Sequence, residues 1–208
     1  TVHIVGLDFD EHNSNLQELL AQVRTGRLDR LAKIAEKLAK KGIEGAYEGA
    51  LAYAVNPEMV SRTHLAEFLL KQGHVRNKQQ AFTKYIGEGK PASVNHEWTT
   101  LEAAVNAIIQ AGGIAVIAHP MRYGFSATAK RNLFEEFKAL GGHGIEVHSG
   151  NCSLNDRLNY ALLANRFDLL ASAGSDFHRK GDFGGGILGV CPELPPTCQP
   201  VWEQFKTS

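Results

Sequence analysis

The chain has 208 residues, of which 43% are hydrophobic and 21% charged, as expected for one globular domain or a domain with one sizeable insertion. Lys and Arg total 22, as do Asp and Glu, and the resulting zero net charge excludes a global basic field for long duplex DNA or an anionic membrane. No apolar run approaches the roughly 20 residues that cross a bilayer. Three cysteines without a CxxC pair favour neither a disulfide framework nor a structural zinc site. We therefore expect a soluble protein of the reducing cytoplasm.

The first half of the chain is predicted to contain one strand followed by helices. An apolar run over 2–9 predicts a buried strand that ends in an acidic, polar loop. Because this strand begins almost at Thr1, we expect that a preceding segment is missing from the sequence. Apolar residues at helical spacing then predict five short helices at 16–23, 28–38, 47–54, 59–70 and 79–86, separated by Gly26, Gly42, Pro57 and Gly73.

After Pro91 the pattern changes to alternating helices and strands joined by short glycine-rich segments. Such alternation implies parallel strands, as in part of an α/β barrel or a doubly wound sheet. We therefore predict an α/β unit formed by 1–13 and 98–208, interrupted by an all-helical insertion at 14–97. The predicted helices of the second half are 99–111, 129–140 and 154–165, and the strands are 114–118, 144–147 and 169–173.

Polar residues of the metal-ligand type follow the predicted strands. His119 comes directly after a strand, and Pro120 favours an extended backbone that directs the ring out of the strand end. Asp176 and His178 follow the last strand, and residues i and i+2 of an extended chain point to the same face. A lone strand histidine such as His3 is more often a core residue than a ligand. The mixture of imidazole and carboxylate suits Mn²⁺, Zn²⁺ or Fe²⁺ better than Ca²⁺.

A second feature is basic: residues 24–41 carry seven basic side chains against two acidic ones. On a helical wheel the lysines lie opposite the apolar stripe, where solvent covers them. Arg27 falls inside the stripe and Arg30 on its edge, so both are expected to point inward, where a guanidinium needs an anion. A phosphate fits this requirement, and an internal salt bridge to Glu48 or Glu67 fits it equally well.

Other polar residues carry weaker signals. His148, at the end of a strand, fits a site or a loop equally well. The chain has no GxSxG elbow and no GxxxxGK[ST] loop, and no base is evident near Cys152, so nucleophilic catalysis and P-loop nucleotide binding are disfavoured. Further candidates for anion contacts are Arg62, His64, Lys90 and Arg122.

The chain resembles the PHP (polymerase and histidinol phosphatase) metallophosphoesterase family in three motifs, VHIVG, AHPMR and GSDFH. A helical insertion between the first two motifs, with RLDRLAKIAEKL, SRTHLAEFL and KYIGEGKPASV, is similar to that of the subgroup with 3′,5′-nucleotide bisphosphate phosphatases and 5′→3′ exoribonucleases. The resemblance covers essentially the whole chain. The family's opening HxH motif, its following aspartate and histidine, and its bridging glutamate are absent, and they would precede Thr1.

The resemblance implies a distorted (β/α)₇ barrel of PHP type, partial in this chain, with a helical insertion that sets substrate specificity. It implies up to three divalent metal ions, Mn²⁺ first, with Zn²⁺, Fe²⁺ and Mg²⁺ as alternatives. The metal ligands would be His3, His119, Asp176 and His178, the last three also as catalytic residues. The substrate phosphates would be held by Arg27, Arg30, Arg62, His64, Lys90 and Arg122.

The activity implied is a metal-dependent phosphatase that removes the 3′-phosphate from a nucleoside 3′,5′-bisphosphate such as pAp. The partner would then be a small nucleotide with two phosphates, with no role for a membrane, and the missing N-terminal segment would complete the site. A 5′→3′ exonuclease on short RNA is the close alternative, and a non-catalytic nucleotide-binding or phosphate-binding remnant is another. Histidinol-phosphate phosphatase is less favoured, because several arginines in the insertion suit a doubly phosphorylated ligand better.

Overall fold

The computed structural model describes residues 1–95, 98–177 and 186–206. It divides into two compact units, which we call the sheet unit (Thr1–Gln17 with Thr100–Ser208) and the helical unit (Glu18–Thr99). Each unit has buried hydrophobic residues of its own that pack together. The mixed α/β class that the sequence predicts is confirmed.

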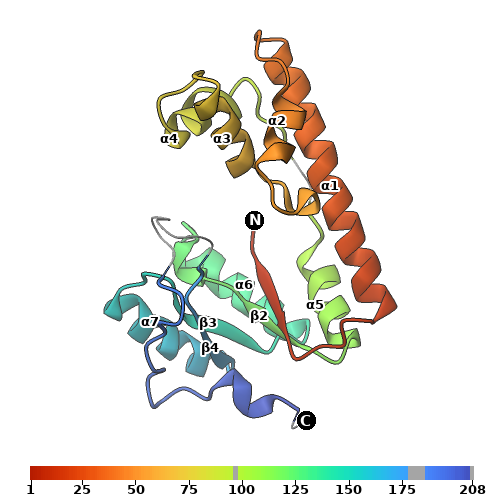
Figure 1. Cartoon of the computed structure of the whole chain (residues 1–208). Coiled ribbons are helices and arrows are strands. Elements are labelled where there is room, and N and C mark those ends of the chain that lie inside the picture. The colour runs from red at the N-terminus through yellow and green to blue at the C-terminus, as the bar shows by residue number, and fades with distance from the viewer. Residues whose placement is uncertain (96–97, 178–185, 207–208) are drawn as a thin grey trace. The chain divides into compact units, whose positions relative to one another are not determined.

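The sheet unit is built on one four-stranded sheet in which the strands follow the order of the chain (Figure 1). The last three strands are parallel, as the alternation of helices and strands predicts. Because parallel strands end at the same edge of a sheet, the polar residues after the second and fourth strands reach one edge, on either side of the third. The strands are β1 (Ile4–Leu7), β2 (Ile114–Ile117), β3 (Gly144–Ser149) and β4 (Leu170–Gly174).

The first strand runs in the opposite direction to the others. β1 is antiparallel to β2, and Ile4 lies opposite Ile117. The start of β1 therefore lies beside the end of β2, and the carbonyl oxygen of His3 accepts a hydrogen bond from the backbone N–H of Ala118 at 3.0 Å. His3 thus reaches the carboxyl end of β2 from the amino end of its own strand, a direction that the sequence pattern does not predict.

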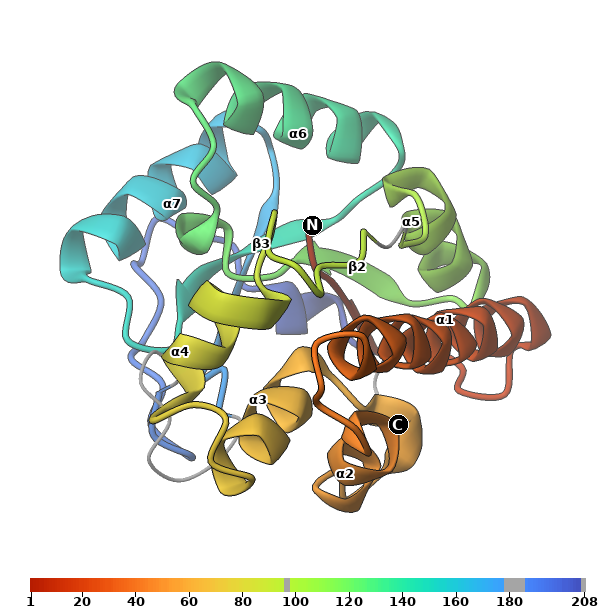
Figure 2. The ribbon, with the colours of Figure 1, turned by 90° about the horizontal axis from the view of Figure 1, so that it is seen from above.

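Three helices form an arc along the outside of the strands (Figure 2). Each begins after a Ser or Thr whose hydroxyl oxygen accepts a hydrogen bond from the backbone N–H three residues later. Phe134 and Phe137 of the second helix are fully buried. These helices are α5 (Leu101–Gln110), α6 (Ala127–Ala139) and α7 (Leu154–Arg166), preceded by Thr100, Ser126 and Ser153. A 3₁₀ helix, η4 (Val201–Gln204), lies near the end of the described chain.

The helical unit packs short helices beside the long helix α1 (Ser14–Ala39), which starts in the sheet unit (Figure 1). Leu31, Ile34 and Leu38 of α1 are buried in the same cluster as Leu65 and Leu69. The remaining elements are η1 (Pro57–Met59, 3₁₀), α2 (Ala46–Ala52), α3 (Arg62–Lys71), α4 (Lys78–Ala81) and the π-helix η2 (Phe82–Ile86).

The predicted break at Gly26 is wrong. The two helices expected on either side of this glycine form one continuous helix of 26 residues. A single glycine costs about 1 kcal/mol relative to alanine inside a helix. The helix-forming residues around it and the burial of the apolar stripe that follows offset this cost.

None of the helices in the described ranges combines the length and the apolar character that crossing a membrane requires.

Candidate functional site

Two left-handed residues mark the ends of β2 and β4. His119 has φ 32° and ψ 52°, and Asp176 has φ 49°. The extended backbone predicted at both positions is therefore wrong. Pro120 disfavours the right-handed helical region for the residue before it, yet the chain must turn into the 3₁₀ helix η3 (Pro120–Arg122). A non-glycine residue in this region costs roughly 1–2 kcal/mol, and such strain concentrates at functional sites.

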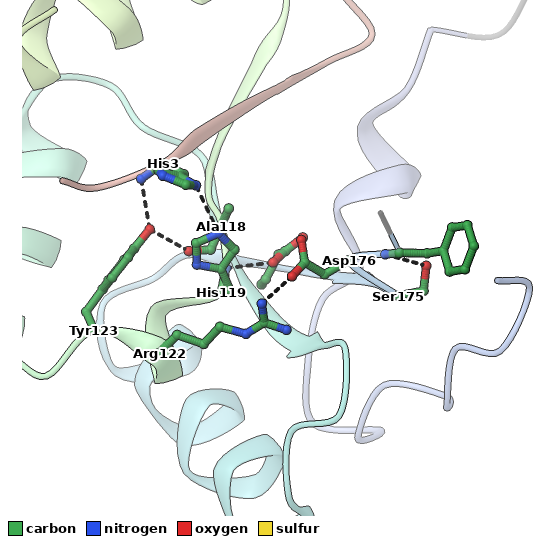
Figure 3. Close-up of polar contacts among 9 residues, drawn as sticks. His3, Ala118, His119, Arg122, Tyr123, Ser175 and Asp176 are labelled. Carbon is green, nitrogen blue, oxygen red and sulfur yellow. Dashed lines mark hydrogen bonds and ion pairs between the residues drawn. The ribbon is translucent and has the colours of Figure 1, made fainter. Parts of the chain in front are cut away.

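The spacing argument that joined Asp176 to His178 does not hold at Asp176, because it requires an extended backbone. His178 itself lies outside the described residues. Asp176 instead forms an ion pair with Arg122, which places these two side chains together in the sheet unit (Figure 3).

A carboxylate on β3 holds the turn at His119. Oε2 of Glu146 accepts a hydrogen bond from the backbone N–H of His119 at 2.6 Å. The same side chain packs against β4, since a Cβ added to Gly174 would meet its Oε1 at 3.2 Å. The sequence analysis did not select Glu146. The available signal was an acidic residue inside an otherwise apolar strand, where a carboxylate is costly unless it is paired.

The imidazoles of His3 and His119 lie edge to face, with Nδ1 of His3 3.1 Å from Nε2 of His119 (Figure 3). Tyr123 joins the two chain segments that carry them. Its hydroxyl donates to the carbonyl of Ala118 at 3.0 Å and accepts from the backbone N–H of His3 at 2.8 Å. Burial raises the pKa of Tyr123, so its hydroxyl stays protonated and able to donate.

The types of side chain gathered here are ones that bind divalent metal ions. Nδ1 of His119 is buried and has no hydrogen-bond partner in the described part of the chain, and a buried polar atom of this sort calls for a ligand. A second imidazole and the carboxylates of Glu146 and Asp176 belong to the donor types that Mn²⁺, Zn²⁺ and Fe²⁺ accept. Within residues 1–95, 98–177 and 186–206, no group of three or more His, Cys, Asp or Glu side chains is close enough to hold a metal. The described donors therefore do not form a metal site by themselves.

The helical unit contains a pocket of about 330 Å³, which we call the arginine pocket. Arg27 and Arg30 of α1 line it together with Arg62 at the start of α3, so the structure brings together three of the six predicted phosphate contacts. The other residues that line it are Leu31, Ile34, Val60, Ser61, Thr63, Leu65, Phe82 and Trp98.

The three pocket arginines form no salt bridge with any carboxylate in the described ranges. Glu67, one acid considered for them, pairs with Lys78 at 2.5 Å. The described residues therefore do not contain the internal salt bridge to Glu48 or Glu67 that the sequence left open. Arg30 is held by its Nε, which donates to the carbonyl of Val94 at 3.2 Å. Burial, and then the charges of Arg62 and Arg27, lower the pKa of Arg30.

The other predicted phosphate contacts lie elsewhere. Nδ1 of His64 accepts a hydrogen bond from the backbone N–H of Ser61 at 3.0 Å and so caps α3. Lys90 is exposed and does not line the arginine pocket. Arg122 lies beside Asp176, as described above.

The prediction that Cys152 lacks a nearby base is wrong. Its Sγ lies 3.2 Å from Nδ1 of His148, which is 5% exposed. Burial and the charge of Arg157 lower the pKa of His148, which favours the neutral imidazole, and a neutral imidazole can accept a hydrogen bond from the thiol. Cys152, Cys191 and Cys198 are free thiols.

No family model matches the chain. It is 46% identical over 206 residues to a 3′,5′-nucleoside bisphosphate phosphatase of Chromobacterium violaceum, and the match covers 99% of this chain and 72% of that protein. It is 42% identical over 204 residues to a 5′-3′ exoribonuclease of Haemophilus influenzae, covering 98% of this chain and 73% of the relative.

Solved structures agree with these relatives. An amidohydrolase from Chromobacterium violaceum, solved with sulfate and without metal, has a TM-score of 0.87 and 46% identity, covering 98% of this chain and 70% of that one. A protein from Bifidobacterium adolescentis described as a metal-dependent phosphoesterase has a TM-score of 0.73 and 25% identity, covering 96% and 68%. The chain therefore belongs to the PHP-type family of bacterial 3′,5′-nucleoside bisphosphate phosphatases and 5′-3′ exoribonucleases.

Proposed function

We propose that the protein is a metal-dependent phosphatase that removes the 3′-phosphate from nucleoside 3′,5′-bisphosphates. The observation that carries this proposal is the arginine pocket, where three guanidinium groups gather and none of the described carboxylates pairs with them. Guanidinium groups match phosphate geometry through paired N–H donors, so such a pocket suits a terminal phosphate. The relative with 46% identity is a 3′,5′-nucleoside bisphosphate phosphatase, which supports the same substrate.

The two units would divide the work. Arg27, Arg30 and Arg62 would bind the 5′-phosphate and orient the nucleotide, which lowers the entropic cost of positioning the reacting phosphate. His3, His119 and Asp176, with His178, would hold divalent metal ions, Mn²⁺ first. A bound divalent ion supplies Lewis-acid stabilisation of charge on phosphoryl oxygens and lowers the pKa of water.

Neighbouring side chains would support this centre. Glu146 would fix the turn that presents the imidazole of His119, through its hydrogen bond to the backbone N–H. Arg122, paired with Asp176, would balance the charge of that carboxylate and contact the phosphate that reacts. His64 and Lys90, which do not line the arginine pocket, would be further contacts to the substrate phosphates.

Four finer points belong to the same proposal. The four-stranded sheet would be part of a distorted (β/α)₇ barrel, and the helical unit would be the specificity insertion. The remaining metal ligands would lie on residues outside this sequence, which spans 72% of the length of the phosphatase. The protein would act in the cytoplasm. Metal analysis combined with the intact mass of the source protein tests whether further metal ligands lie outside this sequence, since a complete site would hold two or three metal equivalents.

A 5′-3′ exoribonuclease is the second candidate, because a relative with 42% identity carries that activity. The same arginine pocket would then bind the 5′-phosphate of a short RNA, and the bond hydrolysed would be a phosphodiester.

A comparison of turnover separates the two activities. The metal-loaded protein is given pAp and a 5′-phosphorylated RNA trinucleotide at equal concentrations, and kcat/KM is measured for each. We expect pAp to be the better substrate. A higher kcat/KM for the RNA would select the exoribonuclease, and hydrolysis of neither would overturn both candidates.

A further inference from the structure

Each arginine of the arginine pocket faces an aromatic ring. The guanidinium carbon of Arg27 lies 5.0 Å from the centre of the Trp98 ring, and that of Arg30 lies 5.9 Å from it. The guanidinium carbon of Arg62 lies 5.9 Å from the ring of Phe82. All five side chains line the same pocket. The helical unit thus gathers three positive charges around two aromatic rings.

A partly buried arginine is usually paired with a carboxylate, and this pocket differs from that arrangement. A carboxylate partner neutralises the charge and occupies the N–H donors along the edge of the guanidinium. An aromatic ring instead interacts with the guanidinium from its π-face. The charge of a guanidinium that lies on a ring is therefore not balanced by a carboxylate, and its edge stays available to an anion.

The local backbone places the ring of Phe82. Phe82 is the first residue of the π-helix η2, a form of helix that is rare and frequent at functional sites. Trp98 lies close in sequence to Val94, whose carbonyl accepts the hydrogen bond from Nε of Arg30. The three guanidinium charges repel one another, and the described part of the chain offers them no ion pair. The contacts with the two rings and the hydrogen bond to Val94 therefore have to oppose this repulsion.

We propose that Trp98 and Phe82 are positioning residues that take the place of acidic counter-ions in the arginine pocket, so that its three guanidinium groups stay aligned, keep a positive charge that no carboxylate balances, and select a terminal phosphate dianion. This inference rests on the proposed function and adds to it the residues that set selectivity. A phosphate monoester carries nearly two negative charges at pH 7, whereas a phosphodiester carries one. Three aligned guanidinium groups therefore favour the monoester.

The test measures binding without catalysis. Isothermal titration calorimetry in EDTA gives the dissociation constants of adenosine 5′-monophosphate and of its 5′-methyl ester. The proteins are the wild type, Trp98→Leu, Trp98→Phe and Phe82→Leu. Trp202→Leu, at an exposed tryptophan of the sheet unit, is the matched control. Circular dichroism and thermal unfolding establish that each variant is folded.

We expect Trp98→Leu to raise the dissociation constant of the monophosphate about tenfold and to reduce the preference for monophosphate over methyl ester. Phe82→Leu should do the same to a smaller extent, Trp98→Phe should restore most of the preference, and Trp202→Leu should match the wild type. With the metal-loaded protein and pAp, Trp98→Leu should raise KM and leave kcat nearly unchanged.

Two results overturn the inference. One is a folded Trp98→Leu protein that binds the monophosphate as tightly as the wild type does. The other is an equal loss of affinity for the monophosphate and the methyl ester, which marks a structural role. A third result would be that the wild-type protein binds neither nucleotide. This result would overturn both the inference and the proposed role of the arginine pocket, so it can be told apart from the first two.

Discussion

The two candidate regions of this chain are opposite in charge and in construction. The strand ends of the sheet unit gather imidazoles and carboxylates around His119 and Asp176, both in strained, left-handed backbone. The arginine pocket of the helical unit gathers guanidinium groups on regular helices, with aromatic rings where carboxylates would be expected. The first region has ligand atoms that suit a metal cation, and the second has N–H groups that suit an anion.

This difference shows how one chain could separate hydrolysis from recognition. Carboxylates suit a site for divalent metal ions, whereas a carboxylate in a phosphate pocket repels the phosphate. Each unit has a buried core of its own, so each group of residues is held by separate packing. A substitution in one region should therefore alter one kinetic property and leave the other, which the following changes test.

The largest effect is expected in the sheet unit. Asp176→Asn removes a negative charge that the metal centre would need, and kcat should fall by about 10³-fold or more, as it does when a transition-state contact is lost. The metal content, measured by mass spectrometry of the elements, should fall with it. Asp168→Asn, which changes an exposed carboxylate paired with Lys138, is the control. Unchanged kcat and metal content in Asp176→Asn would remove this residue from the centre.

A core substitution tests the independence of the two units. Leu69 is fully buried in the helical unit, and Leu69→Ala should lower its free energy of unfolding by about 2–5 kcal/mol. Urea denaturation followed by the fluorescence of Trp98 in a Trp202→Phe background measures this change. The metal content at low denaturant should stay at the wild-type value. A loss of metal there would mean that the helical unit supports the metal centre directly.

The arginine pocket should affect substrate affinity alone. Arg27→Ala and Arg30→Ala each remove charged hydrogen bonds worth about 1.5–3 kcal/mol, so KM for a nucleoside 3′,5′-bisphosphate should rise about 10- to 100-fold with little change in kcat. Arg24→Ala is a suitable control, because Arg24 on the same helix already pairs with Glu58 at 3.3 Å. Steady-state kinetics on pAp decide the matter, and a fall in kcat at unchanged KM would contradict the division of roles.

The smallest effect concerns pH. Burial and the charge of Arg157 lower the pKa of His148, so the native state binds this proton less readily than the unfolded state does. As the pH falls through about 6.5, the unfolded imidazole gains a proton first, and the free energy of unfolding decreases. His148→Gln should therefore show a weaker loss of stability between pH 7.5 and 5 than the wild type.

The order of elements could be predicted from the sequence, because apolar spacing and N-caps are local signals. The helices capped by Thr100, Ser126 and Ser153 start no more than two residues from their predicted starts. The continuous helix through Gly26 could not be predicted, because packing of the residues beyond it compensates for a local cost. The antiparallel direction of β1 depends on long-range pairing with β2, which no local pattern carries.

The candidate site divides in the same way. The inward direction of Arg27 and Arg30 follows from a helical wheel, and the structure places both in the pocket. Their partners could not be predicted, because Trp98 is more than sixty residues away in the sequence. Glu146 was missed because its role depends on the backbone N–H of His119, in the turn that follows the neighbouring strand. The roles of His3, His119, Asp176 and His178 as metal ligands stay predictions.

The most direct test of the central claim is to identify the product of pAp by phosphorus NMR, with the protein loaded with Mn²⁺ and, separately, stripped with EDTA. The account predicts that the loaded protein releases inorganic phosphate and leaves adenosine 5′-monophosphate, and that the stripped protein does neither. Adenosine 3′-monophosphate as the product, or equal turnover in EDTA, would contradict it.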